Sequence, residues 1–129
     1  MKKVSLVSVA LVLLSVISII SSCKKKNEAP VIVFNEPAEG EEYHLSIADS
    51  IHCEFTVTDD NSLHELSVVC TGPSGDTIFS AAPMVHDLKT YEFHGHPHPT
   101  VVGAHHIIVT AEDHDGAVTT GTRNVSVLN

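Results

Sequence analysis

Tryptophan is absent from this chain of 129 residues, and aromatic residues make up only 5% of it. A core with so few aromatic rings has to be built mainly from Val, Ile, Leu, Ala and Phe, and the β-branched residues of that set favour strands. Apolar residues at helical spacing are also missing after residue 29. The sequence therefore predicts an all-β domain without helices.

Basic residues are scarce beyond the amino-terminal region. After Lys26 only Lys89 and Arg123 remain, whereas all 16 acidic residues lie beyond that point, and the formal net charge of the chain is −9 at pH 7. A strongly acidic field repels phosphate backbones, so we expect no nucleic-acid partner. Cations are the natural small partners of such a domain.

The motifs of common enzyme classes are missing as well. The chain has no Gly-x-Ser-x-Gly elbow, no phosphate-binding glycine loop and no His-Glu-x-x-His segment. The spacing of His94, His96 and His98 is similar to parts of the ligand sets of metallo-hydrolases and copper–zinc dismutases, but those sets need further ligands that have no counterpart in this chain. We expect a protein that is not an enzyme, and a small metal-dependent enzyme is the least favoured alternative.

The amino end has the layout of a secretory signal. Two lysines after Met1 precede an uncharged apolar run over residues 4–20, and two serines then lead to Cys23. This order resembles the lipobox of bacterial lipoproteins, in which the cysteine is lipidated and becomes the first residue of the mature chain. We predict a signal peptide over residues 1–22, a lipidated Cys23 with a tether over residues 23–29, and anchoring to a cell-envelope membrane, with the outer membrane favoured. An uncleaved transmembrane anchor is the alternative, because about 20 apolar residues span a bilayer.

The remaining residues 30–129 suffice for one domain. Ile51, Cys53, Phe55 and Val57 alternate with polar neighbours, the period-2 pattern of a strand with one buried face. Similar short segments, bounded by Gly, Pro, Asp or Asn, predict about seven strands over residues 30–34, 51–58, 66–70, 77–79, 89–93, 101–111 and 117–128, whereas residues 39–42 are expected to form a turn. This spacing of turns indicates an antiparallel β-sandwich of immunoglobulin-like type.

One segment carries a specific resemblance. Residues 103–116 are similar to the G-x-Y-x-I-x-V-x-A-x-D-x-x-G pattern of bacterial immunoglobulin-like modules, with His105 at the position of the tyrosine. The whole chain resembles a family of short, histidine-rich bacterial lipoproteins known only as a domain of unknown function, through residues 29–32, 58–61 and 94–98 and through His106 with Asp113. The resemblance implies an immunoglobulin-like sandwich in the cell envelope, without an assigned activity.

Two cysteines remain if Cys23 carries lipid. Cys53 and Cys70 are an even pair in an oxidising compartment, and both occupy inward-facing positions of predicted strands. A disulfide between them and two buried free thiols are both compatible with this pattern.

Ten histidines stand out in a chain of this length. In an extended segment His94, His96 and His98 project from one face, and imidazoles suit Zn²⁺, Cu²⁺ or Ni²⁺. We predict a metal site formed by these three and His106, with zinc as the leading ion. The alternative is a solvated, pH-responsive surface, because free imidazoles titrate near pH 6.5. The remaining histidines are expected to be solvated singly, as for His44, His52, His64 and His86, or packed in the core with one hydrogen-bond partner, as for His105.

Two acidic loops offer oxygen ligands. Asp59 and Asp60 lie in one, and Asp113 and Asp115 in the other, so the four carboxylates are candidate calcium ligands. Asp-Gly and Asp-Asn pairs are first of all turn formers, and the turn interpretation is favoured. Besides metal binding, a structural or adhesive role toward an envelope protein or glycan is the competing hypothesis for the whole domain.

Overall fold

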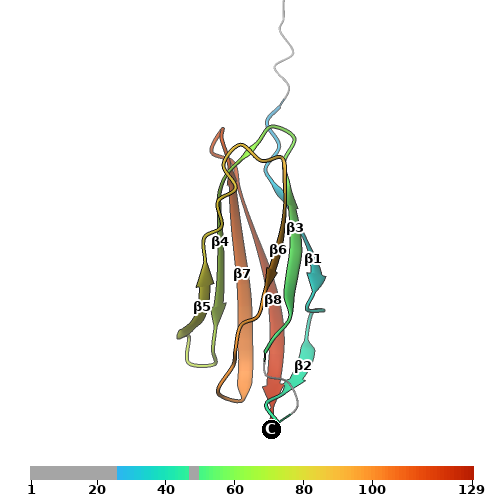
Figure 1. Cartoon of the computed structure of the whole chain (residues 1–129), viewed down its shortest axis with the longest axis vertical. Helices are drawn as coiled ribbons and strands as arrows, with labels where there is room; N and C mark the ends of the chain where they lie inside the picture. The colour runs from blue at the N-terminus through green and yellow to red at the C-terminus, as the bar shows by residue number, and fades with distance from the viewer. Residues whose placement is uncertain (1–25, 47–49) are drawn as a thin grey trace, which may run out of the picture.

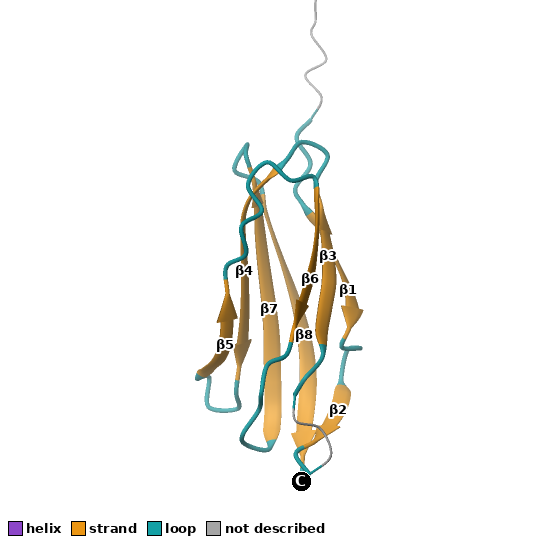
Figure 2. Cartoon of the chain, in the orientation of Figure 1, coloured by secondary structure: helices purple, strands orange, loops and turns teal. Residues whose placement is uncertain are grey.

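The computed structural model describes residues 26–46 and 50–129, in which eight strands form two sheets and no helix occurs (Figures 1 and 2). The strands are β1 (Val31–Glu36), β2 (Glu41–His44), β3 (Cys53–Thr58), β4 (Leu63–Thr71), β5 (Thr77–Ala81), β6 (Thr90–Gly95), β7 (Gly103–Asp113) and β8 (Val118–Leu128). The predicted signal peptide and Cys23 lie outside the described residues. Within them, no helix has the length and apolar character needed to cross a membrane.

The sheets have the strand arrangement of an immunoglobulin-like sandwich. One sheet has the order β1-β3-β6 and the other the order β2-β8-β7-β4-β5. Neighbouring strands are antiparallel except β2, which runs parallel to β8. The carboxyl-terminal hairpin β7–β8 is flanked by β4, while β3 and β6 pair in the opposite sheet, as the corresponding strands do in immunoglobulin domains. The predicted fold class is confirmed.

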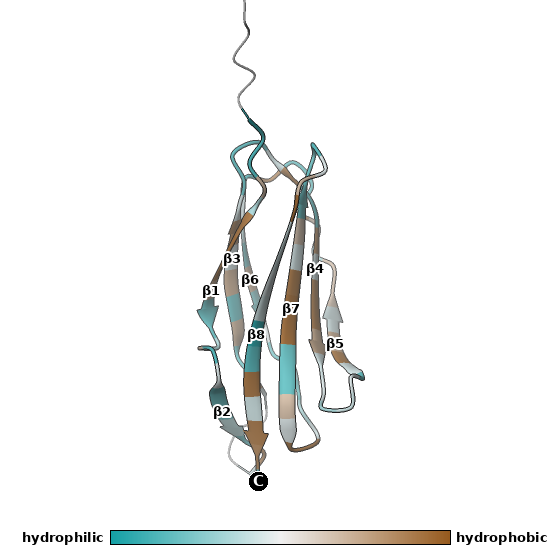
Figure 3. Ribbon diagram, turned by 180° about the vertical axis from the view of Figure 1, so that it is seen from behind, coloured by the Kyte–Doolittle hydropathy of each residue, from teal (hydrophilic) through white to brown (hydrophobic). Residues whose placement is uncertain are grey.

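The core lies between the two sheets and follows the period of two. In β3 the side chains of Cys53, Phe55 and Val57 are fully buried, and in β7 those of Ile107 and Val109 are too. Bands of different hydropathy alternate toward the end of β8, where Val125 and Val127 are buried on either side of Ser126 (Figure 3). The side chains between the buried ones face outward, so each sheet carries an outer surface on which polar groups can gather.

Strand β2 corrects the second half of the turn predicted over residues 39–42, because the turn ends at residue 40. Gly40 has a φ of 75°, a conformation that favours glycine, and the chain then pairs with β8 from Glu41 to His44. The carboxylate of Glu41 accepts a hydrogen bond from the backbone N–H of Ala38 at 2.8 Å. Both glutamates of this edge strand are exposed, so the sequence has no buried face to reveal it.

Cys53 and Cys70 are free thiols in this structure, and both are fully buried. Cys53 belongs to β3 and Cys70 to β4, so they come from different sheets. Burial raises the pKa of Cys53 to about 12, with a smaller contribution from the neighbouring Cys70, and burial raises the pKa of Cys70 to about 11. Of the two alternatives, the structure therefore agrees with two buried free thiols, and Cys53 and Cys70 form no disulfide.

We therefore expect neither thiol to react with an alkylating reagent near pH 8 while the domain is folded, because the reactive thiolate form is suppressed and access is blocked. A full chain with the Cys23→Ser substitution, followed by mass spectrometry, would measure this. Adding Ser74→Cys in the exposed β4–β5 turn supplies a reactive control. Labelling of Cys53 or Cys70 as fast as that of the control would contradict the prediction, and both should react in concentrated guanidinium chloride.

Different loops and turns lie at the two ends of the sandwich. The chain enters at one end, which also holds the β3–β4 turn, the loop before β6 and the β7–β8 turn (Figure 1). We call this the tether end. The β4–β5 turn, the β6–β7 loop and the carboxyl terminus lie toward the other, distal end.

Candidate metal centre

Three histidines meet on the outer face of the three-stranded sheet: His52, His94 and His96, which we call the outer-face cluster. Two of them belong to β6 or follow it directly, and a period of two places them on the same face. The third comes from the segment leading into β3. The pairing of β3 with β6 sets Glu54 opposite His94.

The antiparallel ladder extends beyond the strands themselves. The backbone N–H of Ile51 donates to the carbonyl of Pro97 at 2.8 Å, which continues the register in which Cys53 faces Gly95. His52 is therefore placed opposite His96 and diagonal to His94, within the reach of ring side chains. Backbone pairing, rather than a flexible loop, positions the cluster.

The three rings are packed closely. One ring nitrogen of each histidine lies within 4.8 Å of those of the other two. The rings of His52 and His96 stack with centroids 5.0 Å apart and planes 7° apart, and the ring of His94 stands edge-on to both, at 4.6 and 4.7 Å. Nε2 of His52 directly contacts Nε2 of His94. Three donor nitrogens thus converge on one point of the surface.

Glu36 completes the arrangement from β1. Its carboxylate Oε2 contacts Nδ1 of His52. A carboxylate on one imidazole nitrogen holds the proton there and leaves the other nitrogen free to ligate a metal, the arrangement usual around zinc-bound histidines. Glu54 lies on the same face and accepts a hydrogen bond from Asn35 Nδ2 at 3.1 Å. The surroundings of the cluster are acidic, which favours a cation.

Three imidazoles that share an open surface suit a divalent transition metal. Zn²⁺ takes imidazole nitrogens in tetrahedral geometry, and a site with three protein ligands leaves the fourth position to water, a carboxylate or another ligand. Both His94 and His96 are exposed, and the side chain of His52 is 39% exposed, so an ion can enter without displacing core residues.

The structure brings together two of the four predicted metal ligands, His94 and His96. His98 follows two residues later, past Pro97, and stands outside the cluster. His106 does not approach it, because β7 belongs to the other sheet. Its Nδ1 pairs with Oδ1 of Asn124 in β8 at 2.6 Å. The core of the sandwich separates this outward-facing ring from the outer-face cluster, so the structure does not bring the four predicted ligands together.

Three histidines expected to be solvated singly are clustered instead. His52 belongs to the outer-face cluster, while His64 and His86 join His114 in a second group at the tether end. The outward position of His52 follows from the alternation over residues 51–57, but its partner strand does not. Of the others, His44 binds the carbonyl of Asn129 at 3.1 Å through Nδ1.

His105 is a packed core residue, as predicted, with no exposed surface. Its Nδ1 pairs with the carbonyl of Gly103 at 3.1 Å, whereas its Nε2 is buried without a hydrogen-bond partner. The residue in the tyrosine position of the resembled pattern therefore makes a local backbone contact from within the core.

The four candidate calcium ligands take part in hydrogen bonds within and between the two turns. Oδ1 of Asp59 accepts from the backbone N–H of Asn61 at 2.9 Å, and Oδ2 of Asp115 accepts from Asn61 Nδ2 at 3.1 Å. In the described part of the chain these residues form no group with converging ligand atoms. The carbonyl of Asp60 accepts a hydrogen bond from Lys89 Nζ at 3.2 Å. The turn interpretation fits this geometry.

Asp113 is the most buried of these acids, with no exposed surface. Burial by itself would raise the pKa of its carboxyl group. Hydrogen bonds from Asn27 and from the backbone N–H groups of Ala117, Asp115 and Gly116 outweigh it and hold the pKa below its usual value. The contact with Asn27 Nδ2, at 2.7 Å, fastens the tether to the domain.

No protein-family model and no curated protein sequence matches this chain. Among similar solved structures, CopC from Methylosinus trichosporium OB3b is 13% identical with a TM-score of 0.49, and the match covers 75% of this chain and 93% of CopC. The PKD1 domain of Vibrio anguillarum Epp is 20% identical with a TM-score of 0.48, covering 79% and 96%. An engineered protein is 16% identical with a TM-score of 0.49, and the match covers 78% of this chain but only 20% of that one. These distant likenesses assign no function, and the resemblance to short bacterial lipoproteins stays a prediction.

Proposed function

We propose that this protein is a lipid-anchored lipoprotein of the cell envelope whose immunoglobulin-like module binds a transition metal ion at the outer-face cluster. The observation that carries the proposal is the convergence of His52, His94 and His96 beside the carboxylate of Glu36. Three imidazoles that converge beside a carboxylate on an exposed face offer several ligands to one ion. The signal-like amino end and Cys23 support the anchor, and the outer membrane is the expected location.

Zinc is the expected ion. Three imidazoles with an open fourth position are a known zinc ligand set, and Glu36 can hold the His52 ring in the orientation that a metal requires. Cu²⁺ and Ni²⁺ accept the same donors, and Cu²⁺ binds nitrogen ligands more tightly than Zn²⁺. We propose a binding role rather than catalysis, in line with the lack of common enzyme motifs in the sequence.

Calorimetric titration of the full chain, purified in detergent, with ZnCl₂ tests the proposal. Replacing His52, His94 and His96 together by alanine is expected to abolish one zinc-binding event, and each single replacement to weaken that event at least about tenfold. The matched control removes His44, His98 and His106, which leaves the cluster intact while deleting as many imidazoles. Equal loss of binding in the two triple variants would overturn the proposal.

A further inference from the structure

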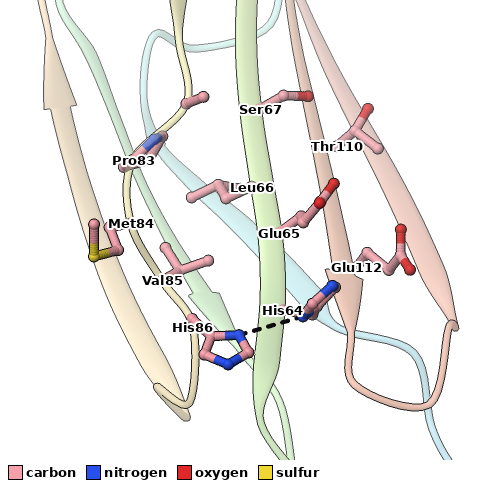
Figure 4. A pocket seen from close by; sticks show the side chains of 11 residues that line it. His64, Glu65, Leu66, Ser67, Pro83, Met84, Val85, His86, Thr110 and Glu112 are labelled. Carbon is pink, nitrogen blue, oxygen red and sulfur yellow. Dashed lines mark hydrogen bonds between the residues drawn. The ribbon is translucent and has the colours of Figure 1, made fainter.

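A second histidine group lies at the tether end of the sandwich and shares no residue with the outer-face cluster. His64 is the second residue of β4, His86 lies in the loop between β5 and β6, and His114 follows β7 directly. Figure 4 shows the ring of His64, from β4, and the ring of His86, from the loop, in contact through their ring nitrogens. We call this group the tether-end cluster. Only the fold brings its three segments together.

The separations within this cluster fit a shared metal ion. Nδ1 of His64 and Nδ1 of His86 are 3.3 Å apart. Two ligands on a tetrahedral zinc ion, each about 2.0–2.1 Å from it, are separated by about 3.3 Å. A hydrogen bond between His64 and His86 would account for this one distance. It would not account for the ring of His114, which packs against both, with its centroid 4.9 Å from the ring centroid of His64 and 4.5 Å from that of His86. One ring nitrogen from each of the three lies within 4.8 Å of the others.

Asp87 places a carboxylate against two of these rings. Its Oδ1 is 3.0 Å from Nε2 of His114, and its Oδ2 is 3.7 Å from Nε2 of His86. A carboxylate in this position orients an imidazole and makes it a better metal ligand. Asp87 also has a φ of 66°, which makes it the one non-glycine residue in the described chain with a positive φ. Aspartate is one of the few non-glycine residues that adopt this conformation readily, so the loop can turn sharply here and present the carboxylate to the two rings.

Backbone hydrogen bonds hold the three segments in place. The N–H of Asp87 donates to the carbonyl of Leu63 at 3.1 Å, and the N–H of Leu63 donates to the carbonyl of Leu88 at 2.7 Å. The N–H of His114 donates to the carbonyl of Ser62 at 3.1 Å. Val85, almost fully buried, anchors the loop to the core. The ligands are therefore arranged before any ion arrives, which lowers the entropic cost of binding it.

The neighbourhood of the cluster is acidic. Glu65 and Glu112 line the same open groove of about 380 Å³ as His64 and His86 (Figure 4). Together with Asp87 they give this end a negative field that draws cations.

We propose that the tether-end cluster is a second, independent transition-metal site, with His64, His86 and His114 as ligands and Asp87 as a positioning residue. The bound ion joins β4, the β5–β6 loop and the β7–β8 turn, which separate when the domain unfolds. Occupancy therefore stabilises the native state by linkage. Saturating zinc is expected to raise the Tm of the domain by at least about 5 °C through this site alone.

Zinc stoichiometry of the full chain in detergent tests the inference. We expect two zinc ions per chain for the wild type. We expect one ion for a first variant, which replaces the three histidines of the outer-face cluster by alanine, and one ion for a second variant, which replaces the three histidines of the tether-end cluster by alanine. If the second variant keeps both ions, or if the first variant binds none, the inference is overturned. If the first variant binds as much zinc as the wild type while the second binds none, this inference stands and the function proposed for the outer-face cluster fails.

A milder substitution guards against misfolding of the triple variants. Asp87→Asn removes the charge but tolerates the left-handed backbone, so the fold should persist. In the background with alanine at 52, 94 and 96, it is expected to weaken zinc binding about 10–100-fold and to reduce the zinc-induced rise in Tm. An unchanged zinc affinity, with circular dichroism showing a folded domain, would exclude Asp87 as a positioning residue and contradict the proposed site.

Discussion

Lowering the pH from about 7.5 to about 5 is expected to release zinc from both clusters. An imidazole binds a metal only through an unprotonated nitrogen, and each cluster offers three of them. Protons compete with the metal for these nitrogens, so the zinc affinity should fall steeply, by well over tenfold, as the pH is lowered across this range. Equilibrium dialysis against a zinc indicator at a series of pH values measures the effect directly.

The fold has to remain intact over this range for the result to mean ligand protonation. Far-ultraviolet circular dichroism of the metal-free chain at the same pH values provides that control. A zinc affinity that changes by less than about tenfold would indicate carboxylate rather than imidazole ligands, because carboxylates stay ionised down to about pH 4. It would contradict both proposed sites.

Replacing Asp113 by alanine is expected to lower the free energy of unfolding by roughly 3 kcal/mol. The carboxylate accepts hydrogen bonds from the backbone N–H groups of Asp115 and Ala117, both at 2.8 Å, and from Asn27 Nδ2. Alanine leaves two turn N–H groups without their acceptor at a fully buried position. Urea denaturation followed by circular dichroism gives the change. A loss below about 1 kcal/mol would contradict a central role for this carboxylate.

Two companion variants separate the contributions. Asp113→Asn keeps an acceptor oxygen but loses the charge and should cost less than alanine, while Asn27→Ala removes only the tether contact and should cost about 1 kcal/mol. Because the pKa of Asp113 is lowered in the folded state, its stabilising effect is present above the ordinary carboxyl pKa near 3.9 and is lost as the pH falls through the lowered value. The difference between wild type and Asp113→Ala should stay constant from neutral pH to about 5 and shrink only in stronger acid.

The fold could be predicted because each long strand buries every second side chain. Cys53, Phe55 and Val57 show that alternation in the sequence and are all buried in the structure. The edge strand β2 could not be predicted, because the side chains of Glu41 and Glu42 are both exposed and show no alternation. The strand is held by backbone pairing with β8. Local patterns thus reveal strands that contribute to the core, and miss those that do not.

The metal ligands depend on long-range pairing, which the sequence does not state. His94 and His96 share a face by local geometry alone, so they could be predicted. Placing His52 beside them requires the register of β3 against β6, and excluding His106 requires knowing that β7 lies in the other sheet. The tether-end cluster joins three segments from distant parts of the chain and had no local signal beyond the abundance of histidine.

The hydrogen bond between Asn27 and Asp113 also bears on how the domain stands at a membrane. With Cys23 lipidated as proposed, only three residues lie between the lipidated cysteine and Asn27, and the four steps from Cys23 to Asn27 span at most about 14 Å. The short tether would then keep the tether end of the sandwich close to the lipid headgroups, with the distal end farther from the membrane. Dissolved ions could then reach both clusters. A large partner protein could approach the outer-face cluster, whereas the bilayer would block its access to the tether-end cluster.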